Sequence, residues 1–161
     1  MHICGVDPGL KGAIALFKPG YLKVWDIPVF EVQRNGKTKN EINYDALGEI
    51  FFGMPEDTHG FVEKVGAMPG QGVTSMFAFG DCYGAIKGAM AAVKIPRAGD
   101  PTPQAWQKVM QARGGKDGSR QRATQLLPAY ADLWRLVKHD GRAEAALIAM
   151  YGWMQLNGGK L

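Results

Sequence analysis

The sequence predicts an α/β fold in which a mixed sheet is flanked by helices. Residues 2–7 are apolar almost throughout, which is typical of a strand at the centre of a sheet. Two further strands follow directly, and strands then alternate with helices along the rest of the chain. With 161 residues, of which 46% are hydrophobic, the chain is expected to form one domain over residues 1–161 with a core of ordinary size.

The first half of the chain supplies four of the five expected strands. Asp7-Pro8-Gly9 ends the first strand, and a Pro19-Gly20 turn joins a strand at 12–17 to one at 21–26. Residues 31–43 are polar and are expected to form a loop. A short amphipathic helix is expected over 45–52, and the fourth strand over 60–65.

The second half is expected to be mainly helical. A Gly/Pro/Gln-rich segment at 66–73 precedes a long helix over 74–93, a short fifth strand at 94–96, and helices at 103–112, 119–127 and 141–153. The long helix carries Gly80, Gly84, Gly88 and Ala92 at a spacing of four. Each Gly costs a helix about 1 kcal/mol relative to Ala, so close packing against either the sheet or a second subunit is expected there.

The composition narrows the function classes without choosing one. A net charge of +4 and a pI near 9.1 suit a polyanionic partner, and equally an ordinary soluble domain. Cys4 and Cys82 belong to no metal-binding pattern and are expected to be small core residues in a reducing compartment. The N-terminus lacks a signal-peptide pattern and no apolar run could span a membrane, so we expect a cytoplasmic protein with no membrane partner.

Acidic residues in three separate segments carry the strongest chemical signal. Asp7 ends the first strand, Glu63 lies in the fourth, and Asp140 and Glu144 stand four apart on one face of the last helix. Carboxylates at the ends of buried elements are costly unless they bind something positive. If they converge, they would bind hard cations such as magnesium, and paired magnesium ions cleave phosphodiesters.

Each acid also has a purely structural interpretation. Asp7 could belong to an ordinary Asp-Pro-Gly turn, and Glu63 could face solvent on an edge strand, paired with Lys64 or Lys11. Asp140 could be a helix N-cap. A reciprocal capping box would need Glu or Gln at 143, which is Ala, so capping leaves Glu144 unexplained.

The stretch from 101 to 130 is basic and contains three glycines. Asp117 is its one acid, and Gly114, Gly115 and Gly118 make its middle flexible. Such a segment suits phosphate contacts, or else forms a solvated helix pair without a partner. Its cationic residues are Lys108, Arg113, Lys116, Arg120 and Arg122.

Several segments together resemble the RuvC-type Holliday junction resolvases, especially the compact phage-encoded branch. Gly5-Val6-Asp7-Pro8-Gly9 resembles the first catalytic strand of that family, and 61–65 (Phe-Val-Glu-Lys-Val) the second acidic strand. Residues 67–72 leading into 77–80 resemble the phage branch, and 139–147 the C-terminal acidic helix. The matches run through nearly the whole chain and are specific only jointly.

This resemblance implies a ribonuclease H-like fold, a homodimer, and nicking of branched DNA with two Mg²⁺ or Mn²⁺ ions in each active site. The substrates would be four-way junctions, with forks and flaps as further candidates, and the host a bacterial cell. Asp7, Glu63, Asp140 and Glu144 take the four acidic, metal-binding positions. The residues we expect to contact DNA are Lys11, Gln71, Phe77, Phe79, Lys108, Arg113, Lys116, Arg120 and Arg122.

The chain departs from the family pattern at two positions. The last acid is more often Asp in the family, and the longer Glu144 would change the geometry of the metal site. Bacterial relatives also carry an aromatic residue shortly after the second acid, where this chain has Gly66, so that role passes to Phe77 or Phe79, or is absent. Because some relatives place His among the acids, His139 is a reserve candidate.

Two other functions compete with a nuclease. An actin-like or sugar-kinase-like ATPase also places Asp and glycines at its first hairpin, but it needs two such domains and a second phosphate loop. A non-catalytic protein of the same fold that binds branched DNA is the alternative from a different class. Four retained acids argue against it, because carboxylates facing DNA weaken binding unless a metal neutralises them.

Overall fold

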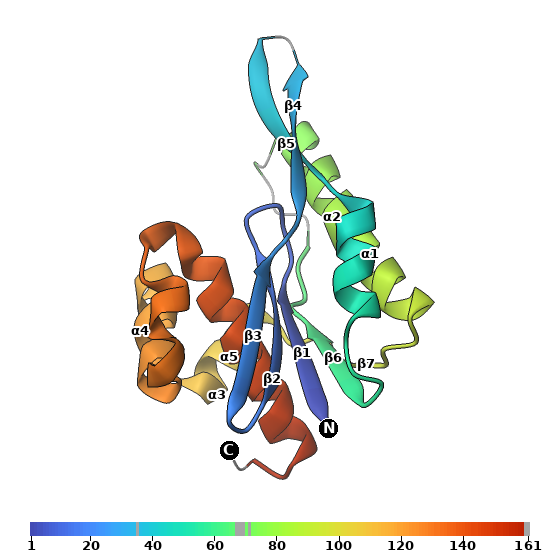
Figure 1. Cartoon of the computed structure of the whole chain (residues 1–161). Coiled ribbons are helices and arrows are strands. Elements are labelled where there is room, and N and C mark those ends of the chain that lie inside the picture. The colour runs from blue at the N-terminus through green and yellow to red at the C-terminus, as the bar shows by residue number, and fades with distance from the viewer. Residues whose placement is uncertain (35, 67–69, 71, 160–161) are drawn as a thin grey trace.

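The computed structural model describes residues 1–34, 36–66, 70 and 72–159, and its centre is a mixed five-stranded sheet in the order β3-β2-β1-β6-β7 (Figure 1). β1, β2 and β3 are antiparallel neighbours, whereas β6 and β7 add in parallel beyond β1. The predicted α/β fold class is therefore confirmed. The strands are β1 (His2–Asp7), β2 (Ala13–Lys18), β3 (Tyr21–Asp26), β6 (Thr58–Val62) and β7 (Arg97–Gly99).

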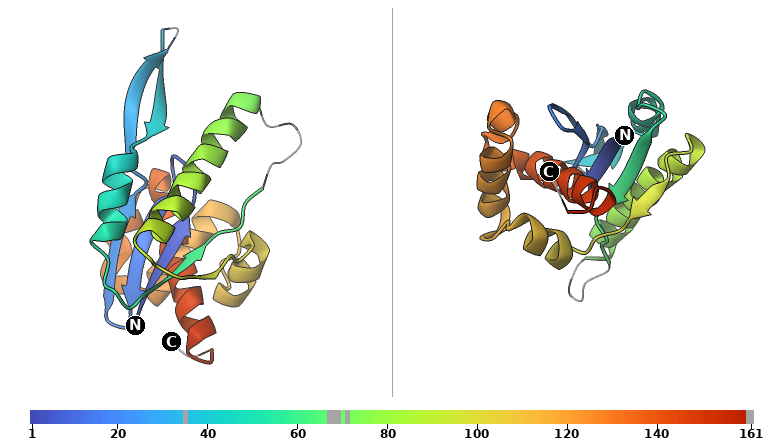
Figure 2. Two further views of the ribbon diagram at one scale, coloured as in Figure 1. Left: turned by 90° about the vertical axis from the view of Figure 1, so that its right-hand side faces the viewer. Right: turned by 90° about the horizontal axis from the view of Figure 1, so that it is seen from below.

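Helices cover both faces of this sheet (Figures 1 and 2). The first face packs against α1 (Tyr44–Phe52) and α2 (Val73–Ala92). The second packs against α5 (Asp140–Leu156), with α3 (Pro103–Met110) and α4 (Gly115–Leu126) beside it. Two 3₁₀ segments, Pro128–Trp134 and Val137–His139, connect α4 to α5.

Strand β1 shows how the chain places one helix against the sheet. Its side chains alternate between the two cores, with Ile3 in the α5 core and Cys4 and Val6 in the α1/α2 core. Gly5 faces α5, where an added Cβ would stand only 2.3 Å from the backbone N of Ala149. The same alternation turns Asp7, the last residue of β1, toward the α5 side.

The expectation of a loop over 31–43 is wrong. The structure has a second, two-stranded antiparallel sheet there, made of β4 (Val29–Arg34) and β5 (Lys37–Ile42). The sequence contains an Asn-Gly pair at 35–36, which is a strong hairpin signal, and Gly36 has φ of +70°. The polar composition of the flanking residues hid this signal, because both faces of the hairpin are largely exposed.

Smaller differences affect the edges of other elements. The last strand is at 97–99 rather than 94–96, because Lys94 has a left-handed backbone (φ +60°) that ends α2 and cannot continue as a strand. β6 covers 58–62 rather than 60–65, and α4 begins at Gly115 rather than at residue 119. Cys4 and Cys82 are free and buried, as expected.

The glycine ridge of α2 does not meet the sheet. Cys82, Ile86 and Met90 face the core, whereas Gly80, Gly84 and Gly88 are exposed, with no heavy atom of the described residues within 4 Å of an added Cβ. Packing of this glycine ridge against the sheet, the first of the two expected partners, is thus excluded. Among the described residues, no helix is both long enough and apolar enough to cross a membrane.

Candidate active site

Asp7 and Glu63 stand side by side at the ends of two parallel strands. Val6 of β1 pairs with Val62 of β6, and the backbone N–H of Glu63 donates to the Val6 carbonyl at 3.0 Å. In β6, Phe61 belongs to the α5 core and Val62 to the opposite core, so Glu63 points toward α5, as Asp7 does. Glu63 is only 8% exposed, which excludes the solvent-facing interpretation.

The N-terminus of α5 lies against these two residues. A Cβ added to Gly141 would stand 3.0 Å from Oδ2 of Asp7 and 2.8 Å from the carbonyl O of Lys11. Asp140 is the residue before Gly141, so it lies in the same turn of α5, and Glu144 follows one helical turn later. The N-cap position belongs to His139, with no side-chain cap hydrogen bond, so capping does not explain Asp140.

The carboxylates of Glu63, Asp140 and Glu144 act electrostatically on Asp7. The pKa of Asp7 is raised well above its usual value, first by burial and then by the carboxylates of Glu144, Glu63 and Asp140, while Lys116 lowers it. Burial is also the largest cause of the raised pKa of Glu144, and Glu63 and Asp140 raise it further. Carboxylates from β6 and α5 therefore act on Asp7 at the end of β1, while the assignment of the four acids as one metal site stays a prediction.

Each of the other three acids has a polar partner that sequence analysis missed or assigned elsewhere. Nε1 of Trp106 donates to Oε1 of Glu63 at 2.7 Å, and this bond lowers the Glu63 pKa against the larger raising effect of burial. The hydroxyl of Ser119 donates to Oε1 of Glu144 at 3.1 Å. Nζ of Lys116, itself largely exposed, lies 2.5 Å from Oδ2 of Asp140.

The donor set fits a hard divalent cation in its chemistry. Carboxylate oxygens are preferred ligands of Mg²⁺ and Mn²⁺, and a cation would relieve the repulsion that raises the Asp7 pKa. Within the part of the chain that the structure describes, however, no three Asp, Glu, His or Cys side chains are grouped closely enough to hold a metal ion. The carboxylates instead point to Trp106, Ser119 and Lys116.

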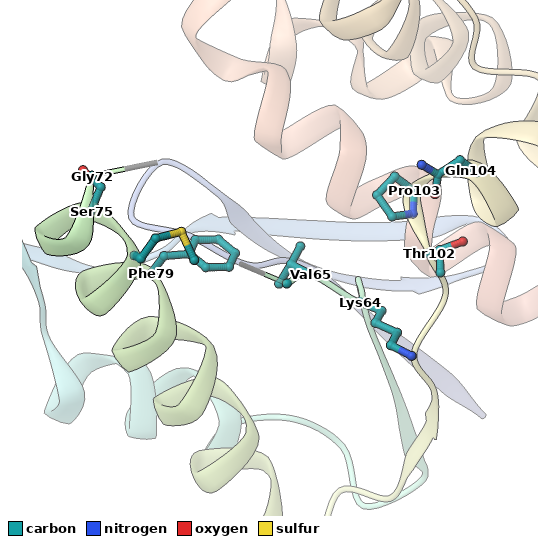
Figure 3. Close-up of a pocket in the computed structure, with 10 residues that line it drawn as sticks. Lys64, Val65, Gly72, Ser75, Phe79, Thr102, Pro103 and Gln104 are labelled. Carbon is teal, nitrogen blue, oxygen red and sulfur yellow. The ribbon is translucent and has the colours of Figure 1, made fainter. Parts of the chain in front are cut away.

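A cleft of about 800 Å³ is lined by Lys64, the residue that follows Glu63 (Figure 3). Lys64 and Val65 leave β6 along its floor, Phe79 of α2 lines one side, and Pro103 at the start of α3 lines the other. Phe79 is half-buried and also lies beside Gly9, in the loop after Asp7.

The other predicted DNA-contacting residues fall into three groups. Lys11, Phe77, Lys108 and Arg113 are exposed, Phe77 to 79%. Arg120 and Arg122 are half-buried and already bonded within the protein, Arg120 to Asp117 and Arg122 to the Met110 carbonyl. Gln71 lies outside the described residues.

His139, the reserve candidate, is half-buried just before Asp140. Its Nδ1 has no hydrogen-bond partner within the described residues. Desolvation, followed by the charge of Arg142, lowers its pKa, which favours a neutral ring. A neutral imidazole could act as a ligand, but within the described residues His139 belongs to no group of three Asp, Glu, His or Cys side chains that could hold a metal ion.

Comparison with known proteins identifies the fold family. No known protein family and no curated protein matches the sequence. Two solved structures of RuvC from Thermus thermophilus are similar to this chain. One is RuvC in complex with a Holliday junction substrate (TM-score 0.58), and the other is a structure of RuvC (TM-score 0.53). Each is 15% identical, and the alignment covers 99% of this chain and 98% of the other. The chain therefore has the ribonuclease H-like fold of RuvC.

Proposed function

We propose that the protein is a metal-dependent endonuclease that nicks four-way and other branched DNA junctions by phosphodiester hydrolysis. One observation carries this proposal: Glu63 lies beside the end of β1 that carries Asp7, and the first turn of α5, with Asp140 and Glu144, packs against the Asp7 carboxylate. Support comes from the shared fold with a protein that was solved on a Holliday junction.

In this proposal Asp7, Glu63, Asp140 and Glu144 hold two Mg²⁺ or Mn²⁺ ions. Such ions activate the attacking water and stabilise the leaving oxygen. The protein itself orients the acids, because Trp106 fixes Glu63 and Ser119 fixes Glu144 through hydrogen bonds. Lys116, now paired with Asp140, is 76% exposed and would be free to contact a phosphate if a cation neutralised Asp140.

Lys11 would contribute the nearest phosphate contact. It is exposed in the loop that follows Asp7, and its carbonyl lies against Gly141 at the start of α5. Phosphate contacts position a nucleic acid and carry no sequence information, so Lys11 would set the register of the cleaved strand.

The proposal includes a homodimer, which would present two active sites to paired strands. The exposed face of α2 suits this role, since its glycines allow close backbone approach and Val73 and Phe77 are 86% and 79% exposed beside them. The finer resemblance, to the phage-encoded branch and hence to a protein working inside a bacterial cell, rests on sequence motifs and belongs to this proposal.

The proposal is tested with labelled four-way junctions, and with plain duplex of the same sequence, in Mg²⁺. Asp7→Asn and Glu63→Gln each remove one charge without changing size. We expect both to abolish nicking of the junction while leaving its binding nearly unchanged. Asp45→Asn and Glu49→Gln, isosteric changes at exposed positions of α1, are the matched controls and should nick normally. Normal nicking by either active-site variant would refute the proposal.

A non-catalytic protein that binds branched DNA is the second candidate. The ion pair between Lys116 and Asp140 favours it, because an ammonium group neutralises one acid without a metal. Titration calorimetry with Mg²⁺ separates the two candidates. The nuclease should show saturable binding that Asp7→Asn removes, and the binding protein should show none.

A further inference from the structure

The β4–β5 hairpin is a projection that the active-site proposal does not use. It extends beyond the end of the sheet where β1 and β6 finish (Figure 1). Two-stranded hairpins on their own are only marginally stable in water, and most residues of this one are exposed, including Phe30 at 53%. The hairpin thus presents most of its side chains to solvent, where they are available to a partner.

The cationic residues of the hairpin share one face. Arg34 lies directly opposite Lys37, Val32 opposite Lys39, and Phe30 opposite Glu41. Directly opposed residues in a sheet point to the same side. This face, which we call the basic face, thus carries three cations and one carboxylate. The other face carries Glu31, Gln33, Thr38 and Asn40, and Gln33 donates to Thr38 there at 2.7 Å.

The basic face borders a groove beside the loop that follows Asp7. Arg34, Lys39 and Glu41 line a groove of about 280 Å³ whose other wall includes Leu10 and Phe77. Leu10 belongs to the loop that follows Asp7, and Phe77 lies near the start of α2. The groove therefore connects the hairpin with the segment that carries the first catalytic candidate.

The acids near this groove already have partners. Glu41 is bonded to Arg34 at 2.7 Å, and Asp81 accepts a hydrogen bond from the hydroxyl of Tyr44 at 2.6 Å. Lys37 and Lys39 have no carboxylate within ion-pair distance in the described part of the chain, and both are exposed. Two lysines thus remain available on one face for an external anion.

We propose that the basic face of the β4–β5 hairpin holds the phosphate backbone of a DNA arm that leaves the active site. This inference rests on the proposed nuclease function and adds a second contact surface to it. The charge decides the class of partner, since Lys37 and Lys39 are complementary to phosphates. A second copy of this basic chain would repel them.

The test compares the double variant Lys37→Ala/Lys39→Ala with the wild type in binding a labelled four-way junction, at several salt concentrations and in EDTA to prevent cleavage. The control is Lys18→Ala/Lys23→Ala, which removes two exposed lysines from the β2–β3 hairpin. Each phosphate contact contributes about 0.9 to the slope of log K against log salt. The hairpin variant should lower that slope by about 1.8 and weaken binding at least fivefold at low salt, and the control should change neither.

Other outcomes overturn the inference in distinguishable ways. If the wild type binds and nicks the junction and the hairpin variant has the same affinity and slope, the hairpin inference fails alone. If the wild type binds no branched DNA, the nuclease proposal and the hairpin inference both fail. If the hairpin variant changes sedimentation of the free protein but not its DNA affinity, the basic face is a contact between copies of this chain. Equal thermal unfolding of the two double variants excludes a folding defect as the cause.

Discussion

Gly141 lies against the carboxylate of Asp7 with no room for a larger side chain. A Cβ at 141 would stand 3.0 Å from Oδ2 of Asp7, 3.0 Å from Cα of Gly12 and 2.8 Å from the carbonyl O of Lys11. This contact joins residues 134 positions apart (141 − 7) and fixes the first turn of α5 relative to the end of β1. The relative position of the four acids depends on it.

Gly141→Ala should therefore damage the site. Two of the atoms that the new methyl group meets are backbone, so α5 has to shift. We expect a loss of about 1–3 kcal/mol in the free energy of unfolding, together with a large loss of junction nicking. Gly48→Ala in α1 is the control, because open space surrounds it and Ala favours a helix by about 1 kcal/mol. Urea unfolding of Gly141→Ala and Gly48→Ala measures the difference in their free energies of unfolding. Equal stability of the two variants would contradict the close contact between Gly141 and Asp7.

Trp106→Phe should show how far the pKa of Glu63 depends on the hydrogen bond from Trp106. The change leaves a buried carboxylate without its hydrogen bond, which typically costs about 1–3 kcal/mol. Because this bond lowers the Glu63 pKa, its loss should raise that pKa further and move the acidic limb of the nicking pH profile upward. Trp134→Phe is matched, since Trp134 is equally buried and donates to Thr124 at 3.0 Å, and it should leave the pH profile unchanged.

The raised pKa of Asp7 predicts how stability depends on pH without divalent ions. A carboxyl whose pKa is higher in the folded state than its ordinary 3.8 stabilises the fold below that value, and this contribution is lost as pH rises through the folded pKa. Asp7→Asn keeps the site neutral throughout. The variant should therefore become more stable than the wild type as pH rises above about 4.

The difference in stability between the wild type and Asp7→Asn also cancels the contributions of other titrating groups. Asp57 has a pKa lowered to about 2, chiefly by the N-terminal amine, and loses its contribution as pH falls, but it does so equally in both proteins. Thermal unfolding across pH in EDTA gives the difference directly. A difference between wild type and Asp7→Asn that does not change with pH would show that Asp7 titrates normally. Saturating Mg²⁺ should reverse the order by stabilising only the wild type.

The sequence predicted the sheet, and it singled out the acids as candidates, because both inferences follow local rules. The apolar run of residues 2–7 identifies the central strand, and an acid at the end of such a run is unusual enough to notice. The β4–β5 hairpin was missed because neither of its faces is mainly buried, so hydrophobic alternation is weak and only the Asn-Gly pair at 35–36 of the sequence indicates it.

The partners of the acids could not be predicted in the same way. Trp106 and Ser119 bond to Glu63 and Glu144 across 43 and 25 residues, contacts that depend on how α3 and α4 pack beside α5. Burial of a carboxylate requires a donor, but the sequence does not say which one. The pairing of Lys116 with Asp140 likewise follows from the first turn of α4, which begins four residues earlier than expected.

Gly84→Arg tests the proposed dimer surface on α2. Arg favours a helix more than Gly does, and open space surrounds Gly84, so the isolated subunit should be at least as stable as the wild type. A long charged side chain on a contact surface should nevertheless dissociate a dimer. Gly48→Arg, at another helical glycine in open space, should leave the assembly intact. Sedimentation velocity decides, and unchanged sedimentation of Gly84→Arg would exclude this face of α2.

The most direct measurement is a Mn²⁺ titration followed by the electron paramagnetic resonance signal of the free ion. We expect the wild type to take up two ions per chain, since the carboxylates of Glu63, Asp140 and Glu144 all raise the pKa of Asp7 and a bound cation would relieve that repulsion. Asp7→Asn should lose this uptake, and Asp45→Asn should retain it. Absence of uptake by the wild type at millimolar Mn²⁺, or equal uptake by Asp7→Asn, would contradict a metal-binding role for these acids.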